Sequence, residues 1–160
     1  MDIRKHGNML LQSLAPILEI TGRDKEEMVF DRNNECFLTF EDKIVLMFYL
    51  DEDLNTIIIN SLLGILPQDD SREEIMYELL CGNYCWNLSE GGTLGVDRET
   101  AVITLGYFVD LPLEPVELFE EIIAKLVNVT DYWIKKLSEI QDDYAGSTGN
   151  SEVSSHFMRV

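Results

Sequence analysis

The residue types that most often carry out chemistry in proteins are few and scattered in this chain. Its two histidines, His6 and His156, lie near the two ends, where we expect mobile segments that cannot support a general base or a nucleophilic pair. Cys81 and Cys85 have three residues between them, one more than a redox or zinc-knuckle pair, and no second Cys or His pair stands nearby to complete four ligands. The sequence therefore predicts neither histidine-based catalysis nor a metal site.

Acidic residues occur in adjacent pairs, which raises the question of acid–base chemistry. The pairs are Glu26–Glu27, Asp69–Asp70, Glu73–Glu74 and Glu120–Glu121. They lie beside predicted turns or on polar helix faces, where solvated charge is the usual explanation.

The stretch from Gly91 to Gly95 has no following Lys and opens no helix, so we interpret it as a tight turn and not as a phosphate loop. We expect no catalytic residue and no cofactor, and we keep a small carboxylate-dependent hydrolase as the less favoured alternative.

The overall charge restricts the partners that the protein can bind. The chain has 12 Lys and Arg against 30 Asp and Glu, a net charge of −18, which repels nucleic acid and anionic membranes and favours basic or uncharged partners. Solubility alone would explain the same charge. The longest apolar region, Ile44 to Leu66, is interrupted by acidic residues before it reaches the roughly 20 residues that cross a bilayer. We expect no nucleic-acid binding and no membrane insertion.

Further features favour a cytoplasmic protein. The start of the chain has basic residues before an apolar stretch, but Gln12 and Ser13 interrupt that stretch, and no cleavage site of small residues follows. The three cysteines, Cys36, Cys81 and Cys85, are an odd number embedded in apolar segments. This pattern is typical of buried, reduced thiols and not of a disulfide framework.

The spacing of apolar residues predicts an α+β fold in which helices pack against an antiparallel sheet, in the order α-β-β-β-α-β-β-α. The expected helices cover Leu10–Leu18, with Pro16 kinking the helix or beginning a separate turn, a segment starting at Ser71, and Val116–Ile140. The expected strands are Cys36–Phe40, Lys43–Leu50, Thr56–Leu66, Thr93–Val96 and Thr100–Asp110, with a further short strand at Met28–Phe30.

The ends of two predicted helices carry separate signals. Ser71 and Glu74 have the spacing of a capping box, so the second helix should begin at Ser71. From about Gln141 the apolar period is lost and Asp, Gly, Ser, Thr and Asn dominate. We therefore predict one domain over residues 1–140, followed by a flexible polar tail over residues 141–160.

The central strands suggest a binding protein. The segment Ile44–Leu50 is apolar on both of its alternating faces, whereas a half-solvated antiparallel strand would alternate with polar residues. Three helices cover one face of such a sheet, so a partner subunit or an extended client is an economical cover for the other. Patterning leaves open that the helices and loops close the whole core of a monomer. The aromatic residues Tyr84, Trp86, Tyr107, Phe108 and Trp133 fit a core or an interface better than a separate aromatic binding patch.

Several local patterns together resemble the Tir chaperone family, the class I chaperones of type III secretion. They are Leu79-Leu80-Cys81-Gly82-Asn83, the run from Gly91 to Asp97, the strand Ala101–Val109, and Leu111-Pro112-Leu113-Glu114 before the final helix. The resemblance covers most of residues 9 to 140, and the size and acidity of the chain agree with it. It implies a homodimer without enzymatic activity, working in the bacterial cytoplasm. Such a protein binds the N-terminal region of a secreted effector and keeps it extended and competent for export.

The resemblance also implies positions for the two kinds of contact. Seven residues of the first helix and first strands would hold the effector: Leu10, Leu14, Val29, Phe30, Phe37, Leu38 and Phe40. Five residues of the second helix and later strands would form the dimer contact: Met76, Leu80, Trp86, Ile103 and Leu105. An exposed edge strand could pair with the effector backbone while apolar grooves accept its side chains.

Two further partner hypotheses accompany this interpretation. The secretion ATPase is an additional candidate partner. The same fold could instead sequester a regulator of secretion, and only the identity of the bound protein would distinguish this role from effector binding.

Overall fold

The structure is a computed structural model, and it describes residues 2–16, 25–40 and 43–151 of the chain. The helices are α1 (Ile3–Ser13), α2 (Ser71–Asn83) and α3 (Glu117–Ser151), with short 3₁₀ turns η1 (Lys25–Glu27) and η2 (Tyr84–Trp86). The strands are β1 (Glu35–Phe40), β2 (Ile44–Asp51), β3 (Thr56–Ile65), β4 (Thr93–Val96) and β5 (Val102–Asp110). This order confirms the α-β-β-β-α-β-β-α fold predicted from the sequence.

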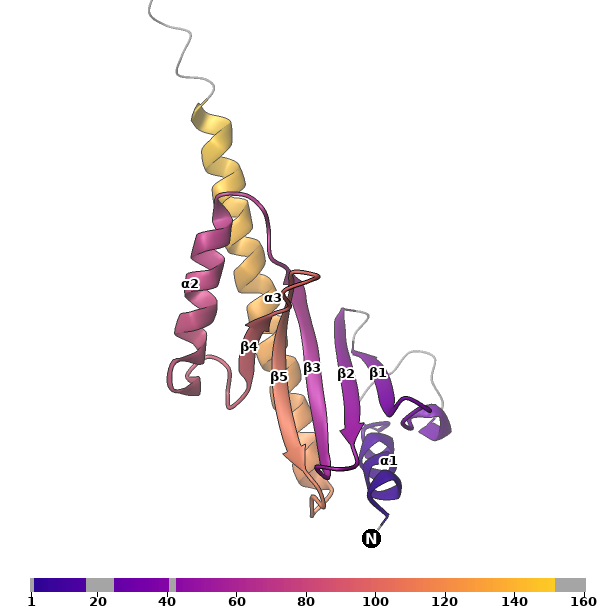
Figure 1. The fold of residues 1–160 in the computed structure, drawn as a ribbon. Helices are drawn as coiled ribbons and strands as arrows, with labels where there is room; N and C mark the ends of the chain where they lie inside the picture. The colour runs from indigo at the N-terminus through magenta and orange to yellow at the C-terminus, as the bar shows by residue number, and fades with distance from the viewer. Residues whose placement is uncertain (1, 17–24, 41–42, 152–160) are drawn as a thin grey trace, which may run out of the picture.

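The strands form one antiparallel sheet in the order β1-β2-β3-β5-β4, so β1 and β4 are its two edges. The long helix α3 runs behind the sheet, and α2 lies beside α3 and β4, while α1 lies near β2 at the end of the sheet where β3 begins (Figure 1). The described helices therefore gather on one side, and no helix or strand among the described residues covers the other face of the sheet.

The covered face carries the core. Alternate strand residues such as Leu46, Phe48, Ile59 and Leu105 point to this face and are fully buried. They meet an apolar stripe of α3 whose members recur at three and four residues: Phe119, Ile123, Leu126, Thr130, Trp133 and Leu137. The stripe includes one polar member, and the hydroxyls of Thr130 and Ser61 satisfy each other at 2.6 Å inside the core.

The predicted strand at Met28–Phe30 is wrong. Met28 and Phe30 are buried, as their apolar character requires, but the segment is not a strand and pairs with none of the strands in the described residues. The backbone of Phe30 is bonded by side chains of α1 instead: its N–H donates to Asn8 Oδ1 at 3.0 Å, and its carbonyl accepts from Arg4 at 3.2 Å. Such side-chain partners satisfy a buried backbone without a ladder.

The helix termini also differ from the predictions. α1 begins at Ile3, with Asp2 as its N-cap, and ends at Ser13, before Pro16. The helix therefore lies earlier in the chain than the predicted Leu10–Leu18. Positions 17 and 18 are outside the described residues. α2 does begin at Ser71, but the capping box is wrong, because the hydroxyl and the N–H of Ser71 both donate to Asp69 Oδ1.

The final helix is longer than the apolar pattern indicates. α3 continues beyond Gln141 to Ser151, where a helix needs only its own backbone bonds and no longer has a sheet beneath it (Figure 1). The predicted division between a domain of 1–140 and a tail of 141–160 stays a prediction, and residues 152–160 are outside the described part.

Candidate partner-binding surfaces

The uncovered face of the sheet, which we call the open sheet face, is rich in exposed apolar side chains. The register places Tyr49, Ile58 and Phe108 side by side across β2, β3 and β5. One row further along the strands, Phe37 lies opposite Met47. Phe108 is 63% exposed, Phe37 44% and Tyr49 38%. Neighbouring apolar residues on one unshielded face are typical of an interaction site, whereas single exposed ones are not.

The open sheet face ends at β1, whose outer side has no neighbouring strand in the described residues. An edge strand presents backbone N–H and C=O groups that can pair with another chain. β1 also alternates between the two faces: Cys36, Leu38 and Phe40 are buried, whereas Phe37 and Thr39 are exposed. A bound segment could therefore pair with the edge and reach apolar side chains of the open sheet face at the same time.

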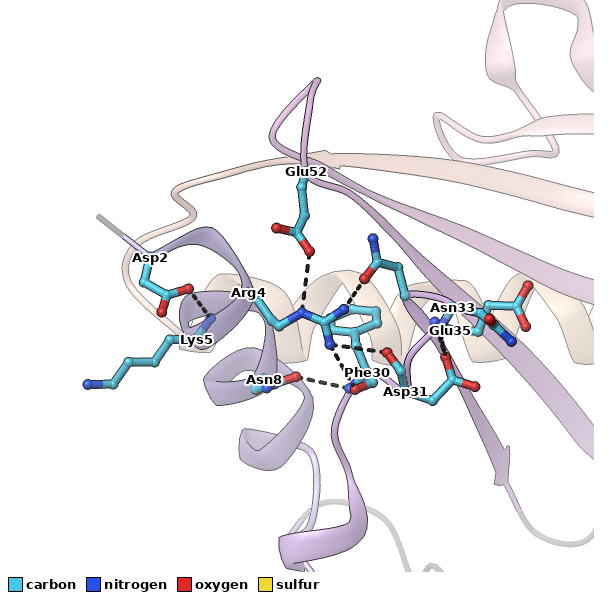
Figure 2. A network of polar contacts seen from close by, with 10 residues as sticks. Asp2, Arg4, Lys5, Asn8, Phe30, Asp31, Asn33, Glu35 and Glu52 are labelled. Carbon is cyan, nitrogen blue, oxygen red and sulfur yellow. Dashed lines mark hydrogen bonds and ion pairs between the residues drawn. The ribbon is translucent and has the colours of Figure 1, made fainter.

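A polar network fixes the segment that leads into β1, and Arg4 of α1 is at its centre (Figure 2). The Arg4 guanidinium donates to the carbonyls of Phe30 at 3.2 Å and Asp31 at 3.1 Å, and also to Asn34 Oδ1. It forms an ion pair with Glu52 in the β2–β3 turn at 3.3 Å. One side chain thus ties α1, the approach to β1 and the end of β2 together, which the planar, multi-donor shape of arginine allows.

A second apolar surface lies on the outward side of α2, which we call the α2 stripe. It consists of Met76, Tyr77 and Leu80 of α2 and Tyr84 of the adjoining η2, all between 44% and 76% exposed. Trp86 of η2 and Val96 of β4 are exposed as well. The opposite side of α2 is buried through Ile75, Leu79 and Gly82. Apolar residues on both sides of a short helix mean that α2 packs on its own chain and still offers apolar surface to a partner.

The position of α2 is set by the first two motifs that carried the family resemblance. A Cβ added to Gly82 would lie 2.4 Å from Trp133 of α3 and 2.7 Å from Leu94 of β4, so only glycine permits this close approach. The Asn83 amide bonds both backbone groups of Leu94, donating to its carbonyl at 2.9 Å and accepting from its N–H at 2.8 Å. These contacts fix α2 against β4 and α3.

An ion pair and an aromatic ring support the same junction between α2 and α3. Lys136 Nζ lies 2.5 Å from Glu78 Oε2 and 5.6 Å from the centre of the Trp133 ring. The hydrogen bond to Glu78 raises the pKa of Lys136 above its ordinary value. The Trp133 indole N–H donates to the carbonyl of Leu88 at 2.8 Å, so its ring is fixed within the core.

The residues predicted to hold the effector fall into two groups. Five are buried in the core of this chain: Leu10, Leu14, Phe30, Leu38 and Phe40. Val29 is half-buried, and Phe37 is exposed on the open sheet face. The structure brings Phe37 together with Met47 and Tyr49, which the prediction omitted although they alternate within the apolar segment Ile44–Leu50. The effector-contact assignment itself stays a prediction.

The predicted dimer residues also divide. Met76, Leu80 and Trp86 are exposed on α2 and η2, whereas Ile103 and Leu105 are buried beneath the helices. Tyr77 and Tyr84 belong to the same surface. Tyr77 was outside every predicted contact set, although it stands beside Met76. The three exposed residues remain candidates for contact with another copy, and the buried two can act only by supporting β5.

The burial of the histidine and cysteine side chains differs from what the sequence indicates. His6 lies in α1, is buried, and places Nε2 at 3.2 Å from the Leu113 carbonyl and 3.3 Å from the Leu113 nitrogen, so the expected mobility of His6 is wrong. Cys36 is buried, but Cys81 and Cys85 are exposed, contrary to the expectation of three buried thiols. Across residues 2–16, 25–40 and 43–151, no group of three or more His, Cys, Asp or Glu side chains is arranged to hold a metal.

The described helices also show no segment that combines the length and the apolar character needed to cross a membrane.

Comparison with solved structures shows the same fold in protein complexes. A chain of the ExsC–ExsE complex superposes with a TM-score of 0.67 at 18% identity, covering 86% of this chain and 97% of that chain. A chain of the HopA1–SchA chaperone–effector complex gives 0.63 at 20% identity, covering 82% and 95%. A chain of the heterodimeric ExoU–SpcU complex from the type III secretion system of Pseudomonas aeruginosa gives 0.56 at 13% identity, covering 83% and 95%.

Sequence comparison identifies the family directly. No curated protein sequence matches this chain. The sequence pattern of one protein family, however, matches residues 10–134, from the middle of α1 to the middle of α3, and so includes every strand of the sheet and both apolar surfaces. The chain belongs to the Tir chaperone protein (CesT) family.

Proposed function

We propose that this protein is a class I type III secretion chaperone that binds the N-terminal chaperone-binding region of one or more effectors in the bacterial cytoplasm. The observation that carries the proposal is the open sheet face, where Phe37 of the edge strand β1, Tyr49 of β2 and Phe108 of β5 are exposed. A client segment that adds to this edge and lays apolar side chains on the face would stay extended. The protein acts by binding, and its function requires no cofactor.

The proposed chaperone is a homodimer, and the α2 stripe is the contact between its two copies. A two-fold contact uses the same patch on both subunits, so an exposed apolar helix face fits an isologous interface. The stripe is separate from β1, because β1 and β4 are opposite edges of the sheet and α2 packs beside β4. Each copy therefore keeps its β1 edge away from the proposed dimer contact.

The direct test is to purify the protein from its native bacterium under secretion-inducing conditions and to identify any companion by mass spectrometry. A dimer that carries the N-terminal region of a secreted effector supports the proposal. A companion that regulates secretion would instead support the regulator-sequestering role. A bare monomer would contradict both the dimer and the stable client complex.

A single substitution tests the client surface. Phe37→Asp should weaken effector binding about tenfold or more, because burying a phenylalanine contributes about 1.5–3 kcal/mol and a factor of ten corresponds to about 1.4 kcal/mol. The matched control is Leu54→Asp, since Leu54 is 71% exposed in the turn between β2 and β3. The affinity is measured by calorimetric titration with the copurified effector region. An unchanged affinity of the Phe37→Asp variant would contradict the assignment of this surface to the client. The dimer mass should stay the same in both variants.

A further inference from the structure

One end of the open sheet face is acidic. The register places Asp51, Thr56 and Asp110 in one row across β2, β3 and β5. The next row on the same face contains Glu35 of β1 beside Tyr49, followed by Ile58 and Phe108. Residues two apart on a strand share a face, so these three carboxylates border the apolar row directly.

No cation of the sheet balances these carboxylates. The sequences of the five strands contain no lysine and no arginine, so no strand of the described sheet brings a positive side chain to the open face. Asp51 is held in place by the chain itself, because its Oδ1 accepts from the N–H groups of Asp53 at 3.1 Å and Leu54 at 2.9 Å. Asp110 Oδ1 lies 3.3 Å from the Thr56 hydroxyl, whose single proton can instead go to the Leu54 carbonyl at 3.2 Å.

We propose that the open sheet face selects an amphipathic client segment in which a cluster of Arg or Lys directly follows the apolar side chains. The inference rests on the proposed chaperone function and specifies its client. The apolar side chains would cover the row of Tyr49, Ile58 and Phe108, while the basic side chains would meet Glu35, Asp51 and Asp110. A carboxylate that is already fixed, as Asp51 is, loses little conformational freedom when a guanidinium binds, which favours a charged partner at this place.

The charges should affect selectivity more than total affinity. An exposed ion pair contributes little by itself, and each carboxylate should change the affinity about two- to fivefold. A rim of like charge also speeds the encounter with an oppositely charged segment and makes that encounter sensitive to salt. The apolar row would supply most of the binding, and the acidic rim would decide which apolar segments bind well.

The experiment uses two synthetic amphipathic peptides with the same leucine stripe, one ending in a cluster of arginines and the other in serines. Titration against the full chain should give tighter binding of the arginine peptide, and higher salt should reduce the difference. The triple variant Glu35→Gln, Asp51→Asn, Asp110→Asn should remove most of this preference. Its amide side chains keep an oxygen acceptor for the hydrogen bonds within the chain, so the fold should persist.

Two matched variants locate the effect. Glu99→Gln, Glu121→Gln and Glu139→Gln together change the net charge by the same amount at exposed positions outside the strands, and the preference for arginine should survive in this triple variant. Phe108→Ser should weaken both peptides, because Phe108 is 63% exposed within the apolar row.

Four results would overturn the inference: failure of both peptides to bind, equal affinity of the two peptides, equal loss of preference in both triple variants, or no weakening by Phe108→Ser. None of these outcomes would remove the proposed chaperone function, which depends on the companion found in the native bacterium.

Discussion

At the scale of single residues, Gly82 shows how closely the family pattern is tied to packing. Its missing side chain lets α2 approach Trp133 and Leu94, two side chains that are at most 5% exposed. The neighbouring Asn83 replaces two missing backbone partners for Leu94. The pair therefore determines where α2, and with it the α2 stripe, stands on the molecule.

Gly82→Ala should destabilise the fold. The new Cβ would lie 2.4 Å from Trp133 Cζ2 and 2.7 Å from Leu94 Cδ1, and overpacking of this kind costs about 1–3 kcal/mol. Gly95→Ala is the control, because a Cβ at Gly95 meets no atom within 4 Å. Urea unfolding of both variants measures the difference in the free energy of unfolding. Equal stability would mean that α2 does not approach α3 as closely as described.

The turn between β4 and β5 should make stability depend on acid. Asp97 Oδ1 accepts from the Thr100 hydroxyl and N–H, both at 2.7 Å, and from the Glu99 N–H at 3.0 Å. The hydrogen bonds to Thr100 lower the pKa of Asp97 below its ordinary value of 3.8. A carboxyl whose pKa is lower in the folded state stabilises the fold above the unfolded pKa, and this contribution is lost as pH falls through the folded pKa.

Asp97→Asn keeps the acceptor oxygen but cannot titrate. The free energy of unfolding of this variant, measured by urea from neutral pH to below 3.8, should therefore fall less steeply in acid than that of the wild type. Glu121→Gln, at an exposed site on α3, is the control for removing one carboxylate. Parallel pH profiles of Asp97→Asn and the wild type would contradict a stabilising role for the charged turn.

Some residues of the candidate surfaces could be predicted from the sequence and others could not. The sequence predicts contacts at Phe37, Met76, Leu80 and Trp86, and these four side chains are exposed. Leu38 was selected together with Phe37, but successive residues of a strand face opposite sides, so the two cannot belong to one surface. The period of two shows which residues share a face. It does not show which face the helices cover, because that depends on tertiary packing.

At the scale of elements, α1 and the approach to β1 depend on one another. The Arg4 guanidinium bonds two backbone carbonyls and Asn34 there, while His6 and Asn8 of the same helix bond the backbone of Leu113 and Phe30 (Figure 2 shows the Arg4 and Asn8 contacts). The edge strand β1 begins directly after this network. Fixing the start of β1 would keep its backbone groups in one register for the proposed client strand.

Arg4→Ala should loosen this region without unfolding the sheet. Hydrogen bonds from a charged donor to carbonyls contribute about 1.5–3 kcal/mol each when buried, and the partial exposure of Arg4 reduces the expected loss to about 1–2 kcal/mol in total. Hydrogen exchange of residues 28–36 should accelerate, and Arg4→Lys should rescue little, because an ammonium cannot reproduce the planar fork. Lys5→Ala, at an exposed position of α1, should leave exchange unchanged.

The sequence predicts the extent of an element where apolar side chains repeat. The prediction fails where polar side chains take the place of backbone hydrogen-bond partners. The five strands and the centre of α3 follow from periods of two and of three to four. Met28 and Phe30 gave a strand-like pattern because they are buried, but Asn8 and Arg4 bond the Phe30 backbone. Bonds from side chains more than 20 positions away leave no local sequence signal.

At the scale of the whole molecule, the distribution of apolar surface determines how the chain can assemble. In the described part of the chain, the helices cover one face of the sheet. We propose that the open sheet face binds the client and that the α2 stripe contacts another copy. A stable interface usually buries more than about 1,000 Å² of surface. The four side chains of the α2 stripe reach this area only when further residues of β4 and η2 take part in the contact. Val96 and Trp86 are exposed there and can enlarge the contact.

Leu80→Glu should convert the proposed dimer into a folded monomer. Leu80 is 69% exposed, so the substitution leaves the core intact, but in an isologous contact it places two carboxylates near the two-fold axis of an already acidic protein. Light scattering should give the mass of one chain, while circular dichroism should match the wild type. Leu54→Glu carries the same change at a comparably exposed turn and should remain dimeric. If Leu80→Glu remains dimeric while a variant of the open sheet face becomes monomeric, the two surfaces have been assigned in reverse, and effector binding should then be sought on the α2 stripe.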